Sequence, residues 1–153
     1  MRLSLLYLLV IGFFLPGHVV AALIVDSPLN FGRIAITNNS VVSSLQMTRN
    51  GQTTATNNIY VLEIGTPGVY TVTELPPYSL LTLTADTPAF SGSTIPGTEQ
   101  FTLTAVDIPA SVPVNVSGTA QFSVGGVLET SGNGGSYIGP ATYEITVNIN
   151  LTY

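Results

Sequence analysis

The segment TYEITVNINLTY, residues 142–153, decides the fold class because large apolar side chains alternate with polar ones along its whole length. Successive side chains of a β-strand point to opposite faces, so the pattern predicts a strand with one apolar and one polar face. The apolar face comprises Tyr143, Ile145, Val147, Ile149, Leu151 and Tyr153. A register shift of one residue would move this face into water, and burial of each such side chain is worth roughly 1.5–3 kcal/mol. We therefore expect a buried face and a strongly specified pairing.

Short runs with the same alternation recur from residue 23 onward, separated by Gly, Pro and Asn. They predict strands at residues 23–26, 31–37, 41–48, 58–64, 69–75, 79–84, 100–108, 118–124 and 142–153. No window after residue 22 has helical spacing, and the 15 glycines and 10 prolines would interrupt most helices. The sequence therefore predicts an all-β domain, an immunoglobulin-like or pilin-like two-sheet sandwich, with a small closed barrel as the alternative.

Three glycine-containing segments predict specific backbone features. Asn50-Gly51 is a strong hairpin signal, for which we expect a type I′ turn with positive φ at both residues. Gly125 and Gly126 lie inside an apolar run, where glycine needs a packing reason, so we expect a bulge or a close approach between strands. The segment SGNGG, residues 131–135, has no following helix or basic residue with which to cradle a phosphate. We interpret it as a mobile hairpin loop.

Residues 1–21 have the order of a cleavable signal peptide. Arg2 precedes an apolar run over residues 3–15, which is followed by Pro16, Gly17 and small residues. The run is shorter than the roughly 20 residues needed to span a bilayer. We predict cleavage after Ala21 or Ala22 and export of residues 22–153 as one domain to the periplasm, the cell surface or the medium. No membrane span is expected once the leader is removed.

The residues after the leader exclude several kinds of chemistry because they include no His, Cys, Trp or Lys. Imidazole general bases, Cys nucleophiles, His or Cys zinc sites and Schiff-base lysines are therefore absent. Eight carboxylates against Arg33 and Arg49 give a net charge of about −6, which repels nucleic-acid phosphates. We predict a protein that is not an enzyme, with no catalytic, cofactor-binding or metal-binding residues, no cofactor and no nucleic-acid partner.

Two further groups of side chains are candidates for function. Glu63 and Glu74 could face each other if residues 66–68 formed a hairpin turn, and paired carboxylates can hydrolyse glycosides. Both occupy polar strand positions, so we interpret them as facing solvent. Among the tyrosines, Tyr78 and Tyr137 lie nearest to loops and are expected to be exposed. We predict these two as contacts for a partner.

Four segments resemble a known family. These are LNFG (residues 29–32), FSVGGVL (122–128), SYIGPATY (136–143) and the alternating strand that ends at Tyr153. Together they resemble the motifs of the secreted bacterial domain-of-unknown-function family 4402, whose ending is similar to that of spore coat protein U-like pilin domains. The resemblance implies a surface or pilus role and supplies no reaction. The chain lacks the disulfide of chaperone–usher pilins, and both a self-contained and an incomplete sandwich fit it.

These observations favour a non-catalytic structural or interaction protein of the bacterial surface or periplasm, such as a pilin-like subunit. Its expected partners are other copies of itself or other surface and pilus proteins. A carbohydrate- or receptor-binding module that uses loop tyrosines on the same sandwich is one alternative. A small outer-membrane β-barrel is another, because the terminal strand alternates and ends in an aromatic residue.

Overall fold

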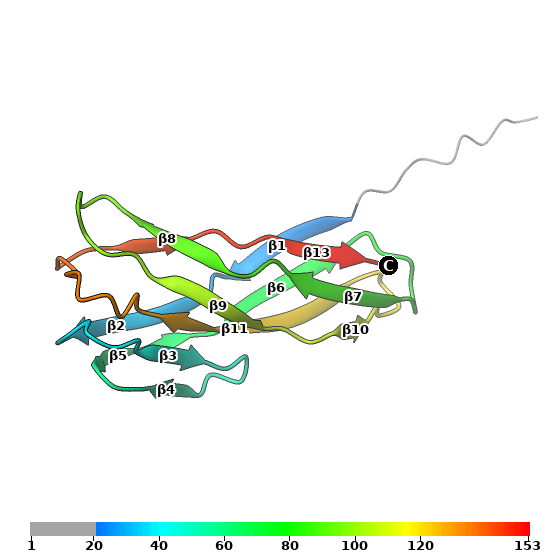
Figure 1. The fold of residues 1–153 in the computed structure, drawn as a ribbon. Coiled ribbons are helices and arrows are strands. Elements are labelled where there is room, and N and C mark those ends of the chain that lie inside the picture. The colour runs from blue at the N-terminus through cyan, green and yellow to red at the C-terminus, as the bar shows by residue number, and fades with distance from the viewer. Residues whose placement is uncertain (1–20) are drawn as a thin grey trace, which may run out of the picture.

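The computed structural model describes residues 21–153, so the predicted leader lies outside the described residues apart from Ala21. The described chain contains thirteen strands and no helix (Figure 1). Antiparallel sheets pack together, and the prediction of an all-β sandwich is confirmed. The strands are β1 (Ala22–Ser27), β2 (Asn30–Ile36), β3 (Ser44–Met47), β4 (Thr53–Ala55), β5 (Ile59–Thr66), β6 (Gly68–Thr73), β7 (Leu80–Ala85), β8 (Ala89–Ser93), β9 (Thr102–Asp107), β10 (Ser111–Pro113), β11 (Ala120–Glu129), β12 (Tyr143–Ile145) and β13 (Ile149–Thr152).

β1 and β2 follow each other along the chain, and so do their partners β5 and β6. β1 pairs with β6, and β2 pairs with β5. β5 and β6 are separated only by Pro67, yet they pair with different strands instead of with each other. The hairpin considered at residues 66–68 is therefore absent. β6 takes both of its partners, β1 and β11, from distant parts of the chain.

β11 is the central strand of the largest sheet. Its first half pairs with β6, and its second half lies between β3 and β9. The strand runs through Gly125 and Gly126 to Glu129, beyond the end that we expected at residue 124. A Cβ added at Gly125 would collide with the backbone carbonyl of Met47, and one added at Gly126 would lie 2.9 Å from Leu103 Cδ1. The predicted close approach between strands is confirmed.

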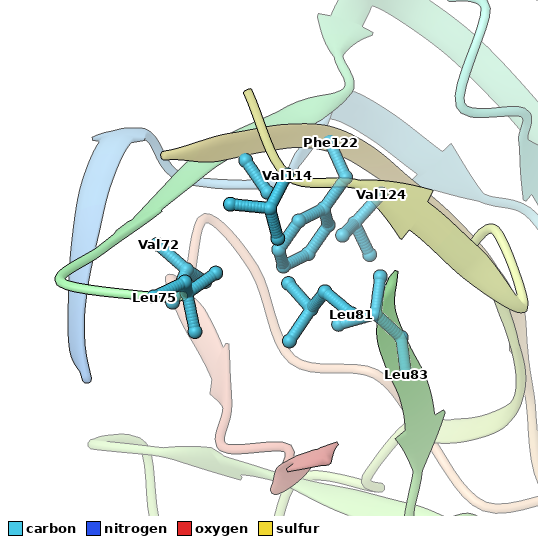
Figure 2. Packing of buried hydrophobic residues seen from close by; sticks show 8 residues of the cluster. Val72, Leu75, Leu81, Leu83, Val114, Phe122 and Val124 are labelled. Atoms are coloured by element: carbon cyan, nitrogen blue, oxygen red, sulfur yellow. The ribbon is translucent and has the colours of Figure 1, made fainter. Parts of the chain in front are cut away.

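The main core lies between the largest sheet and the three-stranded sheet β10-β7-β13. Figure 2 shows Phe122 and Val124 of β11 facing Leu81 and Leu83 of β7. Side chains that interdigitate between two sheets are the core of a sandwich. A second cluster fills the other end of the molecule. Its buried members are Leu45, Ile59, Phe101 and Leu128.

The segment that decided the fold class keeps its two faces but is not one strand. Its apolar residues are half-buried, except for the exposed Tyr153, and its polar residues are exposed. Residues 146–148 separate β12, which pairs with β8, from β13, which pairs with β7. The partner strands are also separate, because β7 ends at Ala85 and β8 begins at Ala89. Pro88 lies in the gap between them and has no N–H with which to donate a hydrogen bond to a neighbouring strand. The prediction of one uninterrupted strand is therefore wrong.

The hairpin at Asn50-Gly51 is present as the turn between β3 and β4. Gly51 has a φ of 84° and donates its N–H to the carbonyl of Thr48 at 2.9 Å. The N–H of Thr48 donates to the carbonyl of Gln52 at 2.8 Å. Asn50 is not among the positive-φ residues of the described chain, so the turn is not type I′. In this loop of three residues, 49–51, only the glycine has to adopt a backbone conformation in the left-handed region.

Candidate functional site

The two tyrosines predicted as partner contacts lie in different environments. Tyr78 is 80% exposed, as expected for a loop residue. Tyr137 is half-buried, and its ring centroid lies 4.5 Å from that of Phe101 and 6.2 Å from that of Tyr143. The expected exposure is therefore found for Tyr78 and not for Tyr137, because the Tyr137 ring packs against the second core cluster. A partner role for either residue stays a prediction.

The hydroxyl of Tyr137 joins two segments of the chain. It accepts a hydrogen bond from the backbone N–H of Ser131 at 3.1 Å and donates one to the carbonyl of Gln100 at 3.0 Å. Burial raises the pKa of this hydroxyl above its usual value of about 10, and the charge of Glu99 adds to the increase. The Tyr137 hydroxyl therefore contributes to the structure as a neutral group.

The loop of residues 131–135 is organised around Asn39, which is 6% exposed. The Asn39 Nδ2 donates to Ser131 Oγ at 2.8 Å and to the carbonyl of Gly135 at 2.9 Å. Its Oδ1 accepts a hydrogen bond from the N–H of Gly132 at 2.9 Å. The loop therefore has a buried side chain at its centre, which the interpretation as a plain mobile hairpin did not include.

The acidic residues that were considered for catalysis do not face each other. Glu63 accepts a hydrogen bond from the Arg33 guanidinium at 2.7 Å, and this ion pair joins β5 to β2. Glu74 follows the end of β6 and has a φ of 62°. The Nε of Arg49 lies 3.8 Å from the Oδ1 of Asp107. Both arginines of the described chain are thus paired with carboxylates.

Residues 21–153 contain neither a metal-binding cluster nor a membrane-spanning helix. No group of three or more His, Cys, Asp and Glu side chains is placed to hold a metal ion in that part of the chain. The same residues include no helix that is long and apolar enough to cross a membrane.

β1 stands at the end of the largest sheet and carries apolar side chains that are in contact with water. Leu23, Ile24 and Val25 are 44%, 47% and 56% exposed. β1 pairs with β6 along one edge, so its other edge presents backbone N–H and C=O groups without a strand partner in the described chain. Edge strands of soluble proteins are commonly protected by Lys or Pro, and β1 contains neither.

The register of β1 shows which side chains belong to the core face. Leu23 lies directly opposite Val72, a fully buried member of the main core. Directly opposite residues of paired strands share a face, so Leu23 and Val25 point to the core side of the sheet. They are still about half exposed because the facing sheet does not cover this edge. The sandwich is thus open along β1.

A second uncovered apolar surface lies on the outer face of β5. Tyr60, Leu62 and Ile64 alternate along this strand and are 56% to 74% exposed. Ile59 and Val61, on the opposite face, pack in the second core cluster. A strand that is apolar on both faces is typical of one covered on both sides. Sequence reasoning missed this surface, although the run IYVLEIG, residues 59–65, carries the signal.

Comparisons of the chain with family models, with curated proteins and with solved structures find no match.

Proposed function

We propose that this chain is a non-catalytic subunit of an exported assembly, pilin-like in its role, whose β1 edge pairs with a strand of a second copy or of another surface protein. The observation that carries the proposal is the uncovered apolar edge of β1. Strand addition to a sheet edge draws affinity from main-chain hydrogen bonds and specificity from alternate side chains. Leu23 and Val25, which point to the core side, would be covered by an added strand.

The exposed apolar surface on the outer face of β5, formed by Tyr60, Leu62 and Ile64, supports an assembly with more than two members. It is a different surface from the β1 edge, since it is a sheet face and not a strand edge. Contacts between unlike surfaces continue from copy to copy and generate rings or open filaments, whereas a contact of one surface with itself closes a dimer. Two unlike apolar surfaces on one subunit therefore favour a filament or a layer.

The composition and the leader agree with this role. Charged residues make up 7% of the sequence, far below the roughly 25% typical of soluble domains. Few charges oppose the burial of an apolar surface between copies. Residues 1–21, interpreted as a signal peptide, would bring the chain to a compartment outside the cytoplasm.

The experiment compares Ile24→Lys with Thr82→Lys in the protein that comprises residues 22–153. Ile24 lies on the free edge strand, whereas Thr82 is exposed on β7, which has partners on both edges. Light scattering after size exclusion and electron microscopy measure assembly, and thermal unfolding verifies the fold. We expect oligomers or filaments from the unchanged protein and from Thr82→Lys, and monomers from Ile24→Lys. A protein that stays monomeric at every concentration, or an Ile24→Lys variant that assembles normally, contradicts the proposal.

A further inference from the structure

The outer face of the β8–β12 pair is hollowed, and none of the residues that line the hollow belongs to β1 or to the buried core clusters. The hollow has a volume of about 510 Å³. The hollow is a shallow depression that lies open to solvent, so a ligand would be bound at the surface of the protein. The lining residues that matter for its chemistry are Phe90, Gly92, Thr94, Thr142, Glu144 and Thr146.

The floor of the hollow is open because of one glycine. Gly92 lies directly opposite Glu144 in the pairing of β8 with β12. A Cβ added at Gly92 would meet no atom within 4 Å, and the φ of this residue is not in the left-handed region. Local packing therefore does not require glycine at this position. Its effect is to leave space beside the carboxylate of Glu144.

Phe90 forms an apolar wall of the hollow. Its side chain is 68% exposed, on a strand whose other face contributes the buried Ser91 to the interior. An exposed aromatic ring offers a flat apolar surface, on which ring-shaped ligands with apolar faces can stack. Thr142 and Thr146, which are exposed at alternate positions on either side of Glu144 in the sequence, also line the hollow.

The charge of the hollow restricts its ligand. Its lining contains one carboxylate and no basic residue. Arg33 and Arg49 are engaged in ion pairs with Glu63 and Asp107, which are not part of the lining. A phosphate, sulfate or carboxylate ligand would thus meet only negative charge. A carboxylate accepts strong hydrogen bonds from hydroxyl donors, and threonine hydroxyls both donate and accept.

We propose that this hollow binds a neutral saccharide, with a sugar ring stacked on Phe90 and two adjacent sugar hydroxyls donating to Glu144. Thr142 and Thr146 complete the polar contacts, and Gly92 leaves the space that the sugar ring occupies. This site is separate from the β1 edge, so it goes beyond the proposed assembly role. It gives a surface subunit the means to attach to glycans.

The test uses saturation-transfer NMR on the exported chain with D-glucose, D-galactose, D-mannose and N-acetyl-D-glucosamine as separate probes. We expect transfer to the ring protons of at least one sugar. Phe90→Ala should weaken the affinity for that sugar at least about tenfold, since the substitution removes the stacking surface. A Cβ at Gly92 meets no atom within 4 Å, so we expect Gly92→Val to fill the floor of the hollow and to abolish the signal while the thermal midpoint is unchanged or raised.

The controls separate this proposal from its rivals and from the assembly role. Thr84→Ala, an exposed change on β7 outside the hollow, should bind sugar normally. Ile24→Lys should also bind normally, so failure of the assembly proposal and failure of this one are distinguishable. Absence of transfer to every sugar, or binding that survives Gly92→Val, overturns the proposal. A response to tetramethylammonium alone would overturn it too, because it would identify a cation site.

Discussion

Replacement of Asn39 by alanine is expected to destabilise the protein severely. The change removes the hydrogen bonds that Nδ2 donates to Ser131 Oγ, to Asn133 Oδ1 and to the carbonyl of Gly135. It also removes the one that Oδ1 accepts from the N–H of Gly132. Each such bond contributes roughly 0.5–1.5 kcal/mol, and a buried group that is left unpaired costs roughly 1–3 kcal/mol. The total loss is expected to be about 2–4 kcal/mol, a large part of the roughly 5–15 kcal/mol that stabilises a typical domain.

The neighbouring residue provides a matched control. Asn38 is exposed, and its Oδ1 accepts only the N–H of Ser40, at 2.6 Å in a local turn. Asn38→Ala should therefore stay within about 1 kcal/mol of the unchanged protein. Urea unfolding of residues 22–153, followed by circular dichroism, measures both free energies.

The variant Asn39→Asp tests which half of the amide matters. It keeps an oxygen for the N–H of Gly132 but places a second oxygen against the carbonyl of Gly135, where a donor is needed. We expect it to be at least as unstable as Asn39→Ala at neutral pH. If Asn39→Ala and Asn38→Ala unfold at the same urea concentration, the loop of residues 131–135 does not depend on Asn39 and the reasoning is refuted.

Two further predictions concern glycine packing and pH. Gly125→Ala should lower the free energy of unfolding by about 2 kcal/mol, because its Cβ would collide with the backbone of β3. Gly92→Ala has free space around its Cβ and should be neutral or slightly stabilising. Equal thermal midpoints of the two variants would contradict this prediction. The raised pKa of Tyr137 means that the folded protein holds the phenolic proton more tightly than the unfolded chain. Its contribution to stability is therefore complete below about pH 10 and lost as pH rises through the folded-state pKa. Urea unfolding at about pH 9 and about pH 11 should show a steeper loss for the unchanged protein than for Tyr137→Phe; parallel losses would exclude this linkage.

The fold class could be predicted from the sequence because a strand imprints its period on the residues. Along residues 142–152 the observed burial alternates as the side chains do. The interruption at residues 146–148 could not be predicted, because it depends on the partners β7 and β8 and not on the segment itself. A strand boundary is thus a property of two segments, whereas the face of a side chain is a property of one.

The short strands β4, β8 and β10 were not predicted from the sequence, for a related physical reason. β8, with the sequence AFSGS, has two serines and a glycine and little intrinsic preference for a strand. It becomes one because β9 and β12 supply hydrogen-bonding edges on its two sides. The Asn39 contacts show the same limit, since Ser131 lies 92 residues further along the chain. Local pattern carries no information about such pairs.

The proposed contacts with other molecules rest on apolar residues that the core does not use. Alternation in the sequence identifies two faces of each strand but not which face another sheet covers, so Leu62 and Phe90 look like core residues until their surroundings are known. In the folded chain the interior is filled by other side chains, and these two remain in water. Exposed apolar groups have an unfavourable hydration free energy. If these residues served only the fold, polar side chains at the same positions would avoid that cost. Places where a sequence departs from the pattern that its fold needs are often sites of function, and here β1 and β5 each carry three exposed large apolar side chains, with Phe90 exposed on β8. A substitution that makes any one of them polar should leave the fold intact and remove one specific interaction.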